Sequence, residues 1–427
     1  MKVLMFGWEF PPHISGGLGT ACYGLTNGMS HLKDMEILFV VPKAFGDEDQ
    51  TKLRLIGAND IELGKSNVSY RKLLEKIQFI EVNSRIVPYT DPEDFYKQLS
   101  KDKEGNKEFV HTHFSGKLEF TGGYGENLFQ EIANYAVVAS QIAASYDFDV
   151  IHSHDWLTYP AGMAAKEVSG KPLVVHVHAT DFDRSGGNVN PGVYEMERTG
   201  MHAADKIITV SNLTRNTVIN NYGIDPEKVV TVYNAVDPVV QKENIIVNKG
   251  YDEKVVTFLG RITMQKGPEY FIEVAKKVLQ KMDNVRFVMA GSGDMMVKMI
   301  WHAASLRIMD KFHFTGFLRG DDVYRMFSVT DVYVMPSVSE PFGISPLEAM
   351  QSNVPVIISH QSGVSEILKH ALKVNFWDID AMADAIYGIL NYDALSGMFK
   401  KHGKEEVENL KWENSARQVR EIYASVL

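Results

Sequence analysis

The chain has 427 residues, of which 45% are apolar and 23% are charged. That length predicts two or three domains, and that composition excludes a disordered chain. The net charge is −10, and residues 1–240 carry most of it, with 22 Lys and Arg against 31 Asp and Glu. An acidic N-terminal half is a poor surface for nucleic acid or anionic lipid, so we expect a neutral or weakly charged partner.

Cys22 is the only cysteine. A single thiol argues against a disulfide framework and a cysteine-based metal site, and it is typical of a reducing compartment. We expect Cys22 to be a small buried side chain rather than a nucleophile. The N-terminus turns polar at Glu9, too early for a signal peptide, and the longest apolar run, residues 37–41, is only strand-sized. The sequence therefore predicts a cytoplasmic protein without stable membrane insertion.

Short apolar runs rich in β-branched residues alternate with longer helical patterns. Unbroken runs of this kind, separated by helices, predict parallel strands that are covered on both faces. The expected strands of the first half are residues 3–6, 37–41, 150–152, 173–178, 206–210 and 229–233. Those of the second half are residues 255–259, 286–290, 312–315, 331–335 and 355–358.

Each half is predicted to be an open α/β sheet with its own core, giving domains of residues 1–239 and 240–410. Residues 43–127, rich in charge, Gly and Pro, are expected to be an insertion in the first domain, and residues 234–254 are expected to form the linker. Ligands of such sheets bind beyond the carboxyl ends of the strands. Two facing sheets therefore place the site in the cleft between them.

A glycine-rich segment, Gly16-Gly17-Leu18-Gly19, follows the first strand and leads into a helical pattern. Glycines there would let the backbone approach a phosphate or sugar at a helix N-terminus, where unpaired N–H groups favour an anion. The spacing is not that of a dinucleotide-binding loop, so a dinucleotide cofactor is disfavoured. A flexible turn is the alternative.

The segment from Gly260 to Gly267 occupies the same place in the second half. It carries Arg261 and Lys266, two cations in a glycine-bounded loop just before an expected helix at Pro268. Arg supplies a bidentate fork and Lys a point charge, which together suit a diphosphate. Loop cations are more often simply solvated, which is the alternative here.

The segment from Glu340 to Glu348 has a carboxylate at each end of a loop-to-helix junction. Ser345 before Pro346, with Glu348 three residues on, also fits a capping box, so Glu348 has a purely structural alternative. Glu340 has no such alternative, because it lies outside the helix, where an acceptor for sugar hydroxyl groups would stand.

Two expected strand ends carry histidines, His152 and His154 at one and His176 and His178 at the other. Alternate strand residues share a face, so geometry alone permits a metal site. Structural or sugar-binding histidines are the favoured interpretation, because strand ends of a buried sheet more often hold hydrogen-bonded or ligand-facing imidazoles. Trp156 is interpreted either as an apolar platform for a sugar or as a core residue.

Taken in order, these segments resemble the retaining glycosyltransferases of the GT-B fold, and more narrowly the glycogen and starch synthases with their bacterial and archaeal relatives. The specific parts are residues 16–19, 154–156, 260–267 and 340–348. The resemblance covers nearly the whole chain. It implies two Rossmann-like domains that face each other across a cleft, a hinge near Asp237, and a helix over residues 411–427 that crosses back to the N-terminal domain.

The resemblance also implies site residues on the C-terminal half. Arg261 and Lys266 would hold the donor diphosphate and stabilise charge on the leaving group. Glu340 and Glu348 would bind hydroxyl groups of the donor sugar and of the ribose, respectively. Backbone groups would add to the sugar contacts at Phe342, Gly343 and Ile344.

On the N-terminal half, the resemblance implies that His178 and Asp155 lie beside the donor sugar. Gly16 and Gly17 would admit the diphosphate from that side. Charge is thus met by protein groups, so neither a metal ion nor a cofactor is expected, and attack on the donor would occur from the front face with retention of configuration.

The implied function is transfer of glucose from ADP-glucose or UDP-glucose to the non-reducing end of an α-1,4-glucan. Two departures leave the base and the acceptor open: His13-Ile14-Ser15 stands where ADP-glucose synthases carry a Lys, and many of them lack the acid that Glu348 supplies. The alternatives are a GT-B transferase of cell-envelope or oligosaccharide synthesis, a sugar-nucleotide epimerase, a phosphorylase with pyridoxal phosphate, or a non-catalytic binding module.

Overall fold

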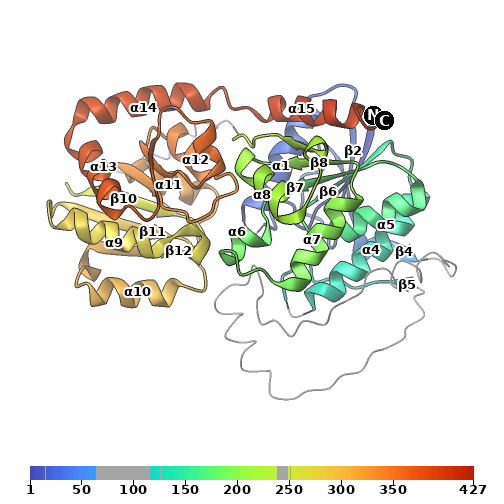
Figure 1. Ribbon diagram of the computed structural model, residues 1–427, viewed down its shortest axis with the longest axis horizontal. Helices are drawn as coiled ribbons and strands as arrows, with labels where there is room; N and C mark the ends of the chain where they lie inside the picture. The colour runs from blue at the N-terminus through green and yellow to red at the C-terminus, as the bar shows by residue number, and fades with distance from the viewer. Residues whose placement is uncertain (15, 64–115, 126, 238–248, 251) are drawn as a thin grey trace, which may run out of the picture.

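A computed structural model describes residues 1–14, 16–63, 116–125, 127–237, 249–250 and 252–427 (Figure 1). It contains two parallel sheets, one in each half of the chain, and each is covered by helices on both faces. The predicted α/β class with two Rossmann-like domains is confirmed. Most of the expected insertion at 43–127 and of the linker at 234–254 lies outside the described residues.

The first sheet has the strand order β3-β2-β1-β6-β7-β8-β9. Its strands are β1 (Lys2–Phe6), β2 (Glu36–Val41), β3 (Arg54–Gly57), β6 (Val150–His154), β7 (Leu173–Val177), β8 (Lys206–Thr209) and β9 (Val229–Thr231). Its helices are α1 (Gly17–Ser30), α4 (Leu128–Ser145), α5 (Tyr159–Ser169), α6 (Asp181–Ser185), α7 (Pro191–Ala203) and α8 (Asn212–Tyr222). A separate antiparallel pair joins β4 (Glu62–Leu63) to β5 (Gly116–Lys117).

The second sheet has the order β12-β11-β10-β13-β14-β15. Its strands are β10 (Lys254–Leu259), β11 (Val285–Ala290), β12 (Phe312–Gly316), β13 (Val332–Met335), β14 (Val356–Ser359) and β15 (Leu372–Val374). Its helices are α9 (Pro268–Leu279), α10 (Met296–Ser305), α11 (Asp321–Val329), α12 (Ser345–Gln351), α13 (Ile379–Asn391) and α14 (Asp393–Val407).

Alternation of apolar side chains gives each sheet two buried faces. Along β1, Leu4 and Phe6 pack into one apolar cluster, while Val3 and Met5 pack into the cluster on the other face. The second sheet repeats this arrangement, for example along β13. Burial on both faces explains why the strands read as unbroken hydrophobic runs.

Every expected strand coincides with an observed one to within a few residues, although β7 ends at Val177 rather than at His178. Two parallel strands are additional, β3 and β15, each at the outer edge of a sheet. Neither is a long apolar run, since β3 begins with Arg54 and β15 has Lys373 at its centre. Edge strands need little hydrophobic surface, which is why the pattern misses them.

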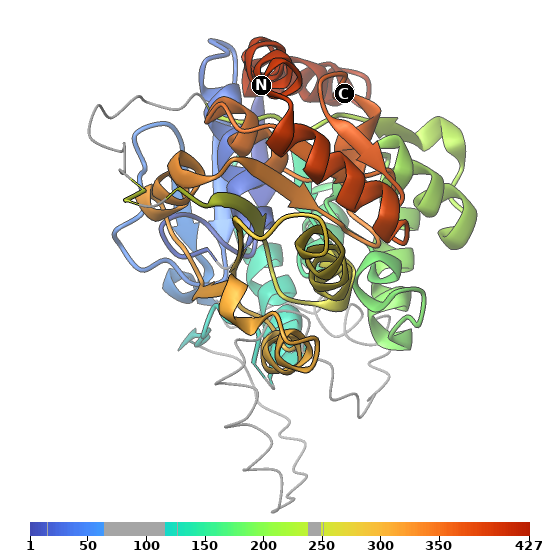
Figure 2. The ribbon, with the colours of Figure 1, turned by 90° about the vertical axis from the view of Figure 1, so that its left-hand side faces the viewer.

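The last helix, α15 (Trp412–Ala424), packs on the first sheet rather than the second (Figures 1 and 2). Its buried residues join the cluster formed by β1 and α1, where Trp412 lies so close to Gly24 that a Cβ there would be 2.2 Å from the indole ring. Arg420 pairs with Asp34 in the turn between α1 and β2, and Tyr423 bonds His152 in β6. The C-terminal helix is therefore part of the first core.

The two domains also touch on the side of α6 and α8. The Ser339 hydroxyl donates to Asp183 over 2.6 Å. The Glu366 carboxylate accepts the first backbone N–H groups of α8, from Asn212 at 2.9 Å and Leu213 at 2.7 Å. These contacts link the two domains on that side of the molecule.

Candidate functional site

A cavity of about 710 Å³ lies between the two sheets. It opens beyond the carboxyl ends of β1 and β10, where the strand order reverses in each sheet, and such switch points are where open α/β sheets bind ligands. All the site residues predicted from sequence line it: Gly16, Gly17, Asp155, His178, Arg261, Lys266, Glu340, Phe342, Gly343, Ile344 and Glu348. The structure therefore brings both halves of the predicted site to one place.

The first glycine motif opens α1 at the wall of this cavity. Gly16 is the N-cap of α1 in an extended conformation, and a Cβ placed on Gly16 or Gly17 would meet no protein atom within 4 Å. Gly19 is different, because a Cβ there would be 2.3 Å from the Ile14 side chain. Packing therefore requires Gly19, whereas Gly16 and Gly17 leave open space beside backbone N–H groups where an anion can approach.

Asp155 anchors the turn that presents His178. Its carboxylate accepts the backbone N–H of His178 at 2.7 Å and that of Ala179 at 3.3 Å, so it joins the ends of β6 and β7. Burial raises the pKa of Asp155 to about 6, while Arg184 and the two backbone donors favour the ionised form. The carboxylate thus has a positioning role in addition to its place on the cavity wall.

Four histidines form a stacked column on one face of the sheet, two from β6 and two at the end of β7. Ring centroids are 4.2 Å apart between His152 and His154 and also between His176 and His178. Burial lowers the pKa of His152 and His178 to about 3 and holds those of His154 and His176 well below the usual range, so the rings are neutral at pH 7.

Hydrogen bonding satisfies only part of this column. His152 bonds Tyr423, and His154 Nδ1 bonds His178 Nε2 at 2.9 Å. Several buried ring nitrogens have no partner among the described residues: Nε2 of His152 and His154, Nδ1 of His178, and both nitrogens of His176. Since an unsatisfied buried polar group costs about 1–3 kcal/mol, the column is unusual for a purely structural element.

The second glycine motif places two cations at the cavity. Arg261 donates to the buried Gln265 at 3.4 Å, and Gln265 is itself fixed because its backbone carbonyl accepts the N–H of Val338. Lys266 forms an ion pair with Glu340. Gly267 ends this turn with φ = +66°, and a Cβ there would be 2.1 Å from the Pro336 carbonyl oxygen. Only glycine allows the loop to turn so close to the next strand.

The loop after β13 is held by the neighbouring strand end. Glu340 donates its N–H to Gln361 and accepts the N–H of Gly363, each at 2.9 Å. Gly343 follows with φ = +102°, a left-handed conformation that favours glycine. The Glu340 carboxylate is nearly buried and faces Lys266, so one acid and one cation from different loops meet at the cavity wall.

The capping-box alternative for Glu348 is wrong. The N-cap of α12 is Ile344, no side chain caps the helix, and Ser345 instead bonds the Tyr333 hydroxyl at 2.8 Å. The Glu348 side chain is turned to the cavity, where burial and then Asp237 raise its pKa to about 7. Glu348 therefore does not belong to a capping box, and its carboxylate stands at the cavity.

Further residues of the cavity wall were not predicted from the sequence. Glu9 accepts a hydrogen bond from the Tyr124 hydroxyl at 2.6 Å, and both side chains line the N-terminal wall. Gly291 has φ = +138°, and a Cβ there would be 1.8 Å from the Gly260 carbonyl oxygen. A strand followed at once by Gly-Ser-Gly, at 291–293, is the signal that could have identified this third glycine loop.

Two family models match consecutive parts of the chain. Residues 103–240 match the model described as Glycosyltransferase Family 4, and residues 240–406 match the model described as Glycosyl transferases group 1. The chain is a glycosyltransferase whose residues 240–406 are of group 1. The predicted glycosyltransferase family is thus confirmed. Among the described residues of this glycosyltransferase, no helix is long and apolar enough to cross a membrane.

Three curated relatives are similar to this glycosyltransferase. An uncharacterized glycosyltransferase of Methanocaldococcus jannaschii is 28% identical over 99% of this chain and 98% of its own. An alpha-maltose-1-phosphate synthase of Mycolicibacterium smegmatis is 28% identical over 65% of this chain and 79% of its own. A glycogen synthase of Mycobacterium tuberculosis is 21% identical over 99% of this chain and 94% of its own.

Solved structures are similar in fold. A sucrose-phosphate synthase from Thermosynechococcus elongatus superposes with a TM-score of 0.71 at 17% identity, covering 99% of this chain and 98% of that one. The Anabaena protein HepE in complex with UDP and glucose superposes with a TM-score of 0.65 at 15% identity, covering 100% of both chains. At these identities the likeness concerns the GT-B fold alone.

Proposed function

We propose that this glycosyltransferase transfers glucose, with retention of configuration, from ADP-glucose or UDP-glucose to the non-reducing end of an α-1,4-glucan. The observation that carries the proposal is the convergence of all eleven predicted site residues on one interdomain cavity. The similarity to a glycogen synthase and an alpha-maltose-1-phosphate synthase supports a glucan-related acceptor. The complex of UDP and glucose with a protein of the same fold supports a nucleotide-sugar donor.

The proposed reaction breaks the bond between the anomeric carbon and a diphosphate oxygen. Arg261 and Lys266 stabilise the negative charge that develops on the leaving diphosphate, which is the largest electrostatic task of the step. The acceptor hydroxyl attacks from the same face, its oxygen bonds the anomeric carbon, and its proton passes to the departing phosphate oxygen. Protein cations meet the charge, so the proposal includes no metal ion and no cofactor.

Each domain contributes one side of the site in this proposal. Glu340 and Glu348 accept hydrogen bonds from hydroxyl groups of the sugar and the ribose, while His178 and the Gly16–Gly17 turn contact the donor from the other domain. Lys266 now pairs with Glu340, and a bound diphosphate would offer it a second anionic partner. The donor therefore has to be held between the two domains.

The decisive experiment measures release of UDP and of ADP from a panel of nucleotide sugars, with glycogen, maltooligosaccharides or no acceptor. Glucan-dependent release, an α-linked product and full activity in EDTA are expected. Turnover of a UDP-sugar without acceptor would indicate an epimerase. Loss of activity in EDTA with rescue by Mn²⁺ or Mg²⁺ would contradict the metal-independent mechanism.

A second candidate function is a transferase of cell-envelope or oligosaccharide synthesis. The observation that favours it is His13-Ile14-Ser15, at the position where ADP-glucose synthases carry a Lys. Donor turnover that requires a non-glucan acceptor, in the same panel, would select this candidate over the glucan-directed one.

A further inference from the structure

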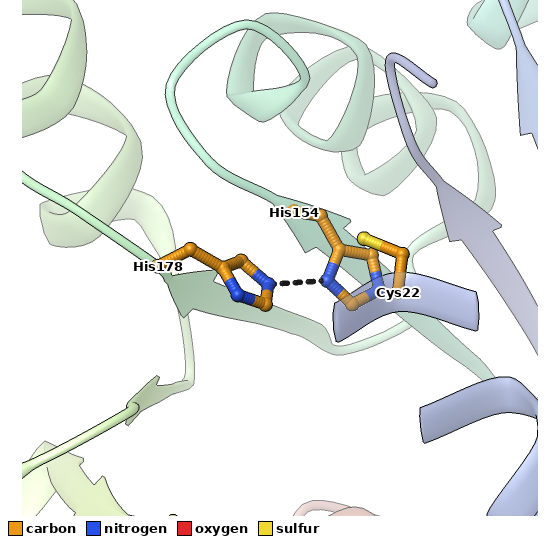
Figure 3. A group of neighbouring side chains, drawn as sticks. All are labelled: Cys22, His154 and His178. Atoms are coloured by element: carbon orange, nitrogen blue, oxygen red, sulfur yellow. Dashed lines mark hydrogen bonds between the residues drawn. The ribbon is translucent and has the colours of Figure 1, made fainter. Parts of the chain in front are cut away.

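Three potential metal ligands meet behind the wall of the donor cavity. Cys22 comes from α1, His154 from the end of β6, and His178 from the turn after β7 (Figure 3). One ligand atom from each lies within 4.8 Å of the other two. Figure 3 shows the His154 ring between the other two side chains, with its hydrogen bond to His178.

We propose that Cys22, His154 and His178 bind a single Zn²⁺ ion, and that the bound ion inhibits transfer by withdrawing His178 from the donor sugar. The proposal of binding stands on the side-chain cluster itself. The proposal of inhibition rests on the proposed function, which puts His178 beside that sugar.

The chemistry of the three ligands suits zinc. Zn²⁺ prefers Cys sulfur and neutral imidazole nitrogen, at about 2.3 Å and 2.0–2.1 Å, in tetrahedral geometry. Two nitrogens bound to one such ion are ~3.3 Å apart. His154 Nδ1 and His178 Nε2 are 2.9 Å apart, so a small movement of the rings admits the ion. A water molecule from the cavity would supply the fourth ligand.

Burial shields the proposed ligand atoms. Cys22 is 1% exposed and His154 is 0% exposed, so competing water is kept away from them. The ion would replace the hydrogen bond between His154 Nδ1 and His178 Nε2. The other two ring nitrogens, His154 Nε2 and His178 Nδ1, are buried without a partner among the described residues, so they do not compete for the ligand nitrogens.

The electrostatic environment favours a cation at Cys22. The carboxylates of Asp155 and Glu9 act electrostatically on Cys22. These two acids attract a positive ion, and a bound metal stabilises the thiolate form of its cysteine ligand. Thiolate and nearby carboxylates together balance the charge of Zn²⁺.

Access of an ion from the cavity favours the Cys22 group over a second group of potential ligands. His152, His154 and His176 also have ligand atoms within 4.8 Å of one another, but none of the three lines the cavity. His178 does line it, and so does Ala21 beside Cys22. An ion from solvent therefore reaches the Cys22 group first.

Cobalt spectroscopy tests the binding directly. Co²⁺ is titrated into tag-free protein, and absorption is recorded in the visible and near-ultraviolet. We expect one equivalent of tetrahedral Co²⁺, displaced by Zn²⁺, with sulfur-to-cobalt charge transfer. Since Cys22 is the only cysteine, that band reports this site alone. Absence of the band in folded wild-type protein overturns the proposal.

Matched variants identify the ligands. Cys22→Ser should abolish the band and His154→Gln should weaken cobalt binding, whereas His176→Gln should retain the band; circular dichroism checks that each variant is folded. Loss of the band in His176→Gln to the same extent as in Cys22→Ser overturns the assignment, and tetrahedral Co²⁺ bound without any sulfur band selects the three-histidine group instead.

Inhibition is measured separately. Zn²⁺ should inhibit wild-type transfer in competition with the donor, and Cys22→Ser should raise the half-inhibitory Zn²⁺ concentration at least ~10-fold, the lower range seen when even an outer ligand partner is lost. If Zn²⁺ displaces Co²⁺ but does not inhibit transfer, the role of His178 at the donor is contradicted. Binding of the metal ion at the site is still supported in that case. If no donor is turned over, the cobalt spectra still decide the binding.

Discussion

Lys266 has two possible anionic partners in the proposed reaction. Without donor it pairs with Glu340, whose side chain is 8% exposed, and with donor it would be within reach of the diphosphate. Until the donor binds, the ion pair neutralises the charge of the nearly buried Glu340 carboxylate. Glu340 can then direct its oxygens to sugar hydroxyl groups while Lys266 turns to the leaving group, so both charges act at the donor.

Removal of the Glu340 carboxylate should therefore affect catalysis far more than folding. Glu340→Ala is expected to lower kcat/KM for transfer by ~100-fold or more, the size of effect of losing one aligned polar group at a transition state. Lys266, itself partly exposed, can be hydrated instead, so the unfolding midpoint should stay near the wild-type value. Glu340→Gln is the matched variant of equal shape. Near-normal transfer by Glu340→Ala would falsify the assignment.

Glu348 should make donor binding dependent on pH. Its pKa is raised to about 7, so the carboxylate is ionised above that pH and protonated below it. If the ionised form accepts hydrogen bonds from ribose, the donor KM should rise as the pH falls from 8 to 6. Glu348→Gln should have a raised KM that no longer changes over this range.

The same substitution has a stability effect of known sign. A raised pKa means that the folded state holds the proton more tightly, so Glu348 costs stability above pH 7 and that cost disappears as the pH falls. Glu348→Gln should thus unfold at the same or higher temperature than wild type at pH 8. A lower unfolding temperature than wild type at pH 8 would contradict this prediction.

At the scale of elements, α15 closes the first core although it follows the whole second domain in sequence. Trp412 is 4% exposed and fills the space above Gly24 and Gly28, two glycines of α1 that could not carry a side chain there. The hydroxyl of Tyr423 reaches the histidine column through His152. Stability of the N-terminal domain therefore depends on the far end of the chain.

Trp412→Ala should destabilise the protein by about 3–5 kcal/mol, the usual cost of truncating a large buried aromatic side chain. Trp301→Ala is the control, because Trp301 on α10 is 73% exposed and its loss should change stability by no more than about 0.5 kcal/mol. Denaturant unfolding monitored by circular dichroism measures both. Equal stability of the two variants would mean that α15 adds nothing to the core.

Particular residues show what the sequence could and could not predict. The buried strands were predictable because packing on both faces demands unbroken apolar runs, and the glycine loops at 16–19 and 260–267 because each follows such a run, whereas the loop at 291–293 was missed. The edge strand β3 was not predictable, because a strand with one exposed side does not need an unbroken apolar run. The sequence from Ser345 to Glu348 fits a capping box, but in the structure the Ser345 hydroxyl bonds Tyr333 instead. The Cys22 cluster was missed because 132 residues separate Cys22 from His154, and pattern analysis sees only local spacing.

For the whole molecule, the division of the site between two domains implies motion. Arg261 and Lys266 belong to one domain and His178 to the other, so a donor must enter the 710 Å³ cavity before all of them contact it. Interdomain contacts of limited size usually permit hinge movement. The hydrogen bond between Ser339 and Asp183 already links the domains on one side of the interface, so we expect it to persist in the closed form.

Closure should be visible in solution. Small-angle scattering is expected to give a smaller radius of gyration with nucleotide and an acceptor oligosaccharide than without ligand, because binding draws the domains together about a hinge near Asp237. Ser339→Ala removes one contact of the closed form without touching the proposed donor groups. It should raise the donor KM and weaken the compaction, and scattering curves at graded nucleotide concentrations measure the shift. Identical curves for the free and ternary states would leave the cleft a preformed site.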